Sequence, residues 1–218
     1  LSLDGLLERL AETASPGLEA YHGWVASLTT PEDLERQCLV ESPLVHSSVV
    51  ARRELLVAHP YRDEKDACLH PGTGSHDHTT WPEDYHLWLR LLRAGVAMAN
   101  LAEPLVRVRV HERRATVTGG FSTRAMARLK LDHLLRTRLS AGSTVVVQGA
   151  GRHGKMWARM LADASIRVRA LLDVASKRQG KRIHGVCVHP VRELPGFQRD
   201  LLIVAVGQKG PNRSEERR

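Results

Sequence analysis

The stretch Thr144–Asp173, TVVVQGAGRHGKMWARMLADASIRVRALLD, carries the clearest fold signal in the chain. Its opening residues Thr144–Gln148 are rich in valine, which favours a buried strand. A glycine-rich turn follows at once, then an amphipathic helix and a second strand over Val168–Leu172 that ends in Asp173. The helix is expected to turn inward an apolar face formed by Met156, Trp157, Met160 and Leu161. This order of elements predicts a βαβ unit and an α/β fold.

The glycine turn has the form Gly149-x-Gly151-x-x-Gly154, which suits a bound nucleotide. Glycines allow a tight turn and let a pyrophosphate approach the N-terminus of the helix. Asp173, at the end of the second strand, is placed to accept hydrogen bonds from a ribose. Such turns also occur in βαβ domains that bind no dinucleotide, so both interpretations stay open. We expect Gly151→Val to disrupt the turn by a steric clash.

The segment Ala141–Ser143 precedes this unit and marks a domain boundary. We expect one domain over residues 1–141 and a Rossmann-like, nucleotide-binding-type domain over residues 142–218. After the second strand the glycines predict turns rather than a crossover helix, and a last apolar strand is expected over Leu201–Val206. The second domain is too short for a complete dinucleotide-binding fold, so we expect it to be truncated.

The first domain has clearer helix signals than strand signals. Thr30 is a capping residue with proline after it, and Asp33 closes a capping box, so a helix is expected from there to about Val40. The other elements that we expect, in chain order, are a strand over Val45–Ala51, a loop over residues 62–80, strands near Val96–Asn100 and across Leu105–Val110, and a helix over Thr123–Leu139.

Two adjacent carboxylates, Glu83 and Asp84, lie at the start of a further predicted helix, within the stretch WPEDYHLWLR. We expect Asp84 to be the N-cap, Pro82 to block the helix upstream and Gly95 to end it. The partial positive charge of a helix N-terminus keeps a carboxylate ionised and ready to accept a proton. This is a suitable position for a general base, although capping alone also explains an aspartate there.

The aromatic and histidine residues around this helix can each have a functional or a purely structural role. Trp81, Tyr85 and Trp88 have the composition of a stacking platform for a sugar ring, but helical spacing favours the core, where we place Trp88. His70, His76 and His78 gather in a glycine-rich loop with Asp77. Loop histidines without a rigid frame are usually exposed to solvent, and we predict no metal site there.

Composition excludes several classes of protein. The chain has 218 residues, 42% of them hydrophobic, with no apolar run near the length that spans a bilayer and no visible secretory leader. Three cysteines without a Cys-x-x-Cys pair indicate neither disulfides nor zinc and fit a cytoplasmic protein. The net charge of +8 is scattered along the chain, so we predict no nucleic-acid binding, although a basic surface attracts anionic lipid or nucleotide-linked substrates.

Leu1 at the start and the charged last residues make both ends look cut, so we expect a fragment.

Six segments of the first domain follow one family in order. They are Ser42–Ser48, Arg52–Glu54, Tyr61–Arg62, Trp81–Arg90, Ala99–Pro104 and Arg107-x-Arg109-x-His111. Together, over roughly residues 20–115, they resemble the C-terminal, acceptor-side half of a family 2 glycosyltransferase with the GT-A fold.

The resemblance implies that Asp84 is the general base, which deprotonates an acceptor hydroxyl that attacks the anomeric carbon and inverts it. A positioned base of this kind contributes about 10²–10⁴ in rate. Glu83 would support Asp84 or contact the acceptor, and His111 would approach the metal and pyrophosphate. Trp81 and His46 complete the expected substrate-binding residues. The implied partners are a nucleotide-sugar donor and a carbohydrate or lipid-linked acceptor, with peripheral contact at the inner face of the membrane.

The sequence departs from this family at the metal site. Family members hold Mg²⁺ or Mn²⁺ and the donor through an Asp-x-Asp in their N-terminal half, and no Asp-x-Asp occurs in this chain. We therefore expect the metal ligands to lie mostly outside the chain, in a donor half upstream of Leu1, and the fragment to be inactive alone.

The second domain resembles small Rossmann-like domains that are appended to sugar-modifying enzymes. The resemblance is carried by Gly149–Gly154, Asp173, Gly180–Gly185 and Val204–Gly207. It supports the fold more than a ligand, so two other classes stay open. One is a nucleotide- or NAD(P)-binding regulatory or redox module centred on the glycine turn, and the other is a basic module that binds polyanions in a salt-sensitive way.

Overall fold

The computed structural model describes residues 16–70, 73, 81–103, 105–106, 123–198 and 200–205. The chain divides into two compact units, which are described separately: residues 1–67 with 78–125, and residues 68–77 with 126–218. In this division the helix Thr123–Thr137 belongs mostly to the second unit, whereas the predicted domain boundary lies after that helix. The boundary at residues 141–142 therefore stays a prediction.

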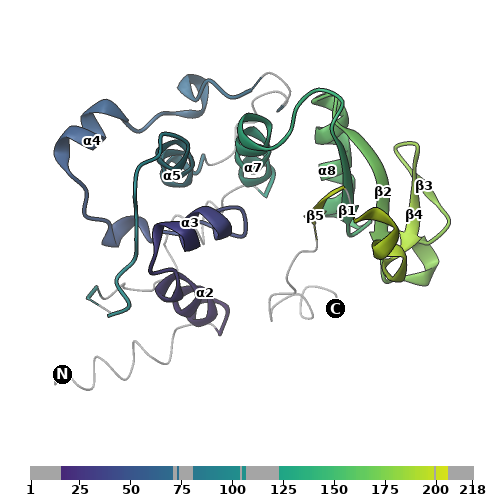
Figure 1. The fold of residues 1–218 in the computed structure, drawn as a ribbon, viewed down its shortest axis with the longest axis horizontal. Helices are drawn as coiled ribbons and strands as arrows, with labels where there is room; N and C mark the ends of the chain where they lie inside the picture. Colours follow the sequence, from purple (N-terminus) through teal and green to yellow (C-terminus); the bar gives the residue numbers. More distant parts are fainter. Residues whose placement is uncertain are drawn as a thin grey trace, which may run out of the picture. The chain divides into compact units, whose positions relative to one another are not determined.

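The regular elements that the structure describes in the first unit are all helices, and they surround one buried helix. Its elements are α2 (Pro16–Ser27), α3 (Pro31–Gln37), the 3₁₀ helix η1 (His46–Ser48), α4 (Arg53–Ala58), the 3₁₀ helix η2 (Glu64–Asp66) and α5 (Glu83–Arg93) (Figure 1). Helix α5 contributes Leu87, Trp88 and Leu91 to an apolar core that Leu28, Leu34 and Leu44 complete. These side chains are almost fully removed from water, so their burial holds α5 in place within the unit.

The predicted helix boundaries hold where a specific cap defines them. Thr30 and Asp33 form the expected capping box at the start of α3, but the helix ends at Gln37 and the chain turns before Val40. Helix α5 ends at Arg93, and the expected stop at Gly95 is confirmed, since its φ of 72° is a left-handed conformation that glycine adopts easily.

The strands predicted for the first unit are wrong where the structure describes them. Val45–Ala51 contains η1 instead, because the Ser48 hydroxyl and backbone N–H both donate to the Val45 carbonyl, at 2.8 and 2.9 Å, and turn the chain. Val96–Asn100 forms no strand, and the Asn100 side-chain amide donates to three backbone carbonyls instead. Leu105 and Val106 lie in no strand, and residues 107–110 lie outside the described residues. The GT-A architecture of this unit thus stays a prediction.

The second unit is α/β, as the βαβ signal predicts. Its sheet has the order β3-β4-β2-β1-β5, in which the parallel strands are β1, β2, β4 and β5 and the antiparallel one is β3. The strands are β1 (Thr144–Gln148), β2 (Arg167–Asp173), β3 (Arg182–Ile183), β4 (Val186–Pro190) and β5 (Leu201–Val204), and the helices are α7 (Thr123–Thr137), α8 (Arg152–Asp163) and the 3₁₀ helices η4 (Ser176–Arg178) and η5 (Val191–Phe197) (Figure 1).

Strand β1 has the predicted bounds, and the chain after β2 makes the predicted turns, as η4 and the β3–β4 hairpin. Across the sheet, the four parallel strands lie in the order third, second, first and fourth along the chain. This order matches the first four positions of the Rossmann order 3-2-1-4-5-6.

Both faces of this sheet carry apolar side chains. Val146, Ala170 and Leu172 pack with side chains of η5. Val145, Val147 and Leu171, which alternate with them along β1 and β2, are also buried. Helix α8 buries Trp157, Met160 and Leu161, while Met156 is only half-buried. This packing fixes the carboxyl ends of β1 and β2, from which the glycine turn and Asp173 emerge. Cys38, Cys68 and Cys187, all within the described residues, form no disulfide.

Candidate active site and glycine turn

Asp84 is the second residue of α5, and the prediction that it caps the helix is wrong. Pro82 occupies the cap position, without a side-chain hydrogen bond to the helix. Asp84 Oδ1 instead accepts a hydrogen bond of 2.7 Å from the backbone N–H of Tyr85. Glu83 and Asp84 together place two carboxylates in the first turn, where the helix dipole favours negative charge. The predicted location at the helix start is correct, although the cap is not.

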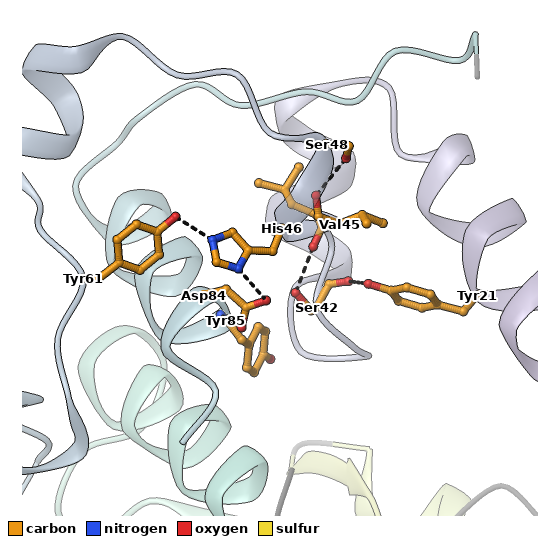
Figure 2. Close-up of polar contacts among 9 residues, drawn as sticks. Tyr21, Ser42, Val45, His46, Ser48, Tyr61, Asp84 and Tyr85 are labelled. Atoms are coloured by element: carbon orange, nitrogen blue, oxygen red, sulfur yellow. Dashed lines mark hydrogen bonds and ion pairs between the residues drawn. The ribbon is translucent and has the colours of Figure 1, made fainter. Parts of the chain in front are cut away.

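The other carboxylate oxygen of Asp84 faces an imidazole. Asp84 Oδ2 lies 4.0 Å from Nδ1 of His46, in η1, and the side chains are 17% and 47% exposed respectively. His46 Nε2 lies 3.0 Å from the hydroxyl of Tyr61. Figure 2 shows the three side chains converging from η1, from the loop after α4 and from the start of α5. The structure thus brings together the predicted residues His46 and Asp84 and adds Tyr61 to them.

Burial raises the pKa of the Asp84 carboxyl above its ordinary value, against the hydrogen bond from Tyr85, which lowers it. The neighbouring charge of Glu83 also raises this pKa, and His46 lowers it. A carboxylate with a raised pKa is a stronger base than one in water. Asp84 is therefore poised to accept a proton while one of its oxygens is held in place by the helix.

The structure gives the predicted aromatic residues different positions. Trp81 donates its indole N–H to the Arg62 carbonyl at 3.0 Å and packs its ring edge-on against His86 at 5.3 Å, so it fastens the loop before it. Tyr85 and Trp88 are fully buried, which confirms the core position predicted for Trp88 and excludes both from a stacking surface.

Sequence reasoning gave Tyr61 no role, and its place in one of the six matched segments was the signal that could have singled it out. Of the predicted site residues, His111 lies outside the described residues.

Metal-ligating residues do not gather in the part of the chain that the structure describes. Across residues 16–70, 73, 81–103, 105–106, 123–198 and 200–205, no group of three or more His, Cys, Asp or Glu side chains is placed to hold an ion. The backbone N–H of His70 donates to Asp132 of α7 at 2.7 Å, while His76 and His78 lie outside the described residues. No metal step is therefore assigned to these side chains.

The glycine turn of the second unit requires glycine at two positions. Gly149 has a φ of 104°, which L side chains rarely adopt, and its N–H donates to the Leu172 carbonyl at 2.6 Å. A Cβ at Gly154 would overlap the Gly149 carbonyl, so only glycine lets the helix approach the strand this closely. At Gly151, by contrast, a Cβ would lie 3.9 Å from the Arg178 guanidinium, in ordinary contact. A single methyl group therefore clashes at Gly154 and not at Gly151, and the clash expected for the larger valine at position 151 stays a prediction.

Asp173 ties this turn to the chain that follows β2. Its carboxylate accepts hydrogen bonds from the backbone N–H groups of Ala150, at 2.7 Å, and Ala175, at 2.8 Å, and pairs with Arg178 at 3.1 Å. Burial acts to raise the pKa of Asp173, but these three partners outweigh it and the pKa is lowered. Both oxygens are engaged by the protein itself, so binding a ribose there would require these contacts to be shared or exchanged. The ribose-binding role of Asp173 stays a prediction.

Comparisons with known proteins point to a glycosyltransferase over part of the chain. No family model matches it. Over 77 residues, 35% of its length, the chain is 30% identical to the amylovoran biosynthesis glycosyltransferase AmsE of Erwinia amylovora, and the match covers 24% of that protein. The chain thus corresponds to about a quarter of this curated relative. Among solved structures, the Rex-family repressor RSP aligns with 61% of this chain and 69% of its own, at 16% identity and a TM-score of 0.29, which is too low to carry an argument.

Among the described residues, no helix has both the length and the apolar character needed to cross a membrane.

The glycine turn makes a paired stability prediction. Gly154→Ala should lower the free energy of unfolding of the second unit by more than about 2 kcal/mol, because the added methyl group displaces the Gly149 carbonyl. Gly151→Ala should change it little. Chemical denaturation followed by circular dichroism measures both variants, and equal destabilisation by the two would contradict the assignment of the clash to Gly154.

The raised pKa of Asp84 makes a second prediction. The folded state holds this proton more tightly than the unfolded state, so stability is greatest while the carboxyl is protonated and falls as pH rises through the folded-state pKa. Asp84→Asn should therefore melt a few degrees above wild type at neutral pH. The difference should shrink on acidification toward about pH 4, the ordinary value for aspartate. The exposed Asp66→Asn is the control, and a pH-independent gap between Asp84→Asn and wild type would contradict this account.

Proposed function

We propose that this chain is the acceptor-side part of an inverting, family 2 glycosyltransferase in which Asp84 is the general base. The observation that carries the proposal is a half-buried carboxylate with a raised pKa, fixed at the first turn of a buried helix and faced by a half-exposed imidazole. The similarity to a glycosyltransferase over 77 residues agrees with it. The six sequence segments that resemble the family include both His46 and Asp84.

The proposed chemistry uses the two oxygens of Asp84 differently. Oδ1 is held by the N–H of Tyr85, whereas Oδ2 faces the more exposed side of the site, toward His46. Oδ2 takes the proton from an acceptor hydroxyl as the hydroxyl oxygen attacks the anomeric carbon of the donor sugar. The bond from that carbon to the nucleoside diphosphate breaks on the opposite face, which inverts the configuration. Glu83 keeps the local field negative and so helps Asp84 to hold the transferred proton.

The remaining substrate contacts follow from the same reading. Trp81 and His46 contact the acceptor, a carbohydrate or a lipid-linked hydroxyl, and His111 lies toward the donor pyrophosphate. A lipid-linked acceptor would bring the protein to the inner face of the membrane. A Mg²⁺ or Mn²⁺ ion bound outside the described residues would neutralise charge on the leaving nucleotide.

The test is release of nucleoside diphosphate from a panel of sugar nucleotides, by the protein extended upstream to its natural start, with Mg²⁺ or Mn²⁺ and a mixed acceptor pool. Asp84→Asn should lower acceptor-dependent release by about 10²–10⁴ while the fold persists, because only the proton acceptor is lost. The exposed Asp66→Asn should release at the wild-type rate. Near wild-type turnover by Asp84→Asn would remove Asp84 from the role of base.

A second candidate function is a nucleotide- or NAD(P)-binding module at the glycine turn. It is favoured by the glycine that the close approach of α8 and β1 requires at position 154, and by the strand order of the sheet. On this reading the full chain binds NADH or NADPH in calorimetric titration, and Asp173→Asn weakens the binding about tenfold through the lost contact to the ribose. If calorimetry detects no heat of binding for any dinucleotide, the turn has a structural role and this second function is wrong.

A further inference from the structure

We propose that Tyr61 is a positioning residue of the Asp84 site, which acts through His46 by orienting its imidazole toward the carboxylate. The inference rests on the proposed role of Asp84 as general base. It follows from a chain of three side chains from separate segments of the first unit, in which each contacts the next (Figure 2).

The loop that carries Tyr61 is fastened on both sides of that residue. The Pro60 carbonyl accepts a hydrogen bond of 2.7 Å from Arg90, and the Arg62 carbonyl accepts one of 3.0 Å from the indole N–H of Trp81. Arg90 belongs to α5 and Trp81 immediately precedes the helix cap, so both donors lie on the segment that carries the proposed base. Tyr61 is 42% exposed, so these two hydrogen bonds, more than burial, define where its hydroxyl lies.

The hydrogen bond between Tyr61 and His46 holds the ring so that Nδ1 faces Asp84. The bond at one ring nitrogen of a histidine determines which nitrogen carries the proton. When the Tyr61 hydroxyl donates to Nε2, the proton of the neutral ring lies on Nδ1, the atom 4.0 Å from Asp84 Oδ2. When the ring is protonated, the same hydroxyl accepts from Nε2 and Nδ1 keeps its proton. In both of these states an N–H faces the carboxylate and favours its ionised form. In the remaining state the neutral ring donates from Nε2 to the Tyr61 hydroxyl, and Nδ1 then turns a lone pair toward Asp84, which an ionised carboxylate disfavours.

The orientation of His46 affects the pKa of Asp84, because charged and titratable groups surround that carboxylate. Glu83, on the same helix, raises the pKa of Asp84, and His46, in η1, lowers it. Burial and the charges of Asp84 and Glu83 raise the pKa of Tyr61, so its hydroxyl is protonated at neutral pH. Asp84 also affects Tyr21, on α2. The pKa of the Tyr21 hydroxyl is raised to about 12, chiefly by burial and further by the charges of Glu41 and Asp84. Together with the backbone N–H of Tyr85, the His46 side chain therefore opposes the effect of Glu83 on the pKa of Asp84.

The experiment is a carbon-detected NMR titration of the Asp84 carboxyl in the full chain labelled with ¹³C-aspartate, with the signal assigned by its loss in Asp84→Asn. Tyr61→Phe removes the hydroxyl and keeps the ring, and it should move the titration midpoint of Asp84 upward by about half a pH unit. His46→Gln should move it at least as far. Tyr21→Phe is the matched control, because that hydroxyl donates to the Ser42 carbonyl at 3.0 Å and not to His46, and it should leave the midpoint unchanged.

A midpoint in Tyr61→Phe equal to that of wild type, or moved no further than in Tyr21→Phe, would overturn the proposal. In the transfer assay, the acid limb of the pH profile of kcat/KM should move with the midpoint, to higher pH. If the midpoint moves but the extended protein transfers no sugar, the positioning role holds and the proposed function fails. If transfer depends on Asp84 but neither midpoint nor acid limb responds to Tyr61→Phe, the function holds and the role of Tyr61 is lost.

Discussion

The burial of α5 is the constraint on which the first unit depends. Leu87, Trp88 and Leu91 anchor the helix in the apolar core, and Tyr85 donates its hydroxyl to the Cys38 carbonyl at 2.6 Å. A helix held at so many points cannot rotate about its axis without opening the core. The direction of the Asp84 side chain, one residue before Tyr85, is therefore set by packing. The apolar side of α5 thus fixes the position of the polar group proposed to do the chemistry.

The second unit depends on a different constraint, the approach of α8 to the end of β1. This approach leaves no room for a Cβ at position 154, and it places the N–H of Ala150 against the Asp173 carboxylate. The same glycines that suit a pyrophosphate are therefore already required by the packing of helix on strand. Because packing alone requires glycine at position 154, the glycine pattern indicates the βαβ fold whether or not a ligand binds.

The elements that could be predicted from the sequence are those whose signal is local. The capping box at Thr30, the stop at Gly95 and the valine-rich strand β1 each depend on neighbouring residues. The strand predicted over Val45–Ala51 was wrong because the Ser48 hydroxyl and N–H both bind the Val45 carbonyl and turn the chain there. The contact of His46 with Tyr61 joins residues 15 positions apart, through a loop that Arg90 and Trp81 hold from farther along the chain. No local pattern contains such a contact, so the candidate site could be predicted only in part.

Asp84 and Asp173 show why residue type alone does not define a site. Each lies at the end of a regular element and accepts a backbone hydrogen bond, and burial acts to raise the pKa of both. At Asp84 burial prevails and the pKa is raised, whereas at Asp173 two N–H groups and Arg178 together outweigh burial and the pKa is lowered. A carboxylate whose two oxygens accept close hydrogen bonds is a weaker base than aspartate in water, whereas one with a raised pKa is a stronger base. Chemistry that needs a proton acceptor is therefore better supported at Asp84, and Asp173 is better explained as the residue that holds the glycine turn closed.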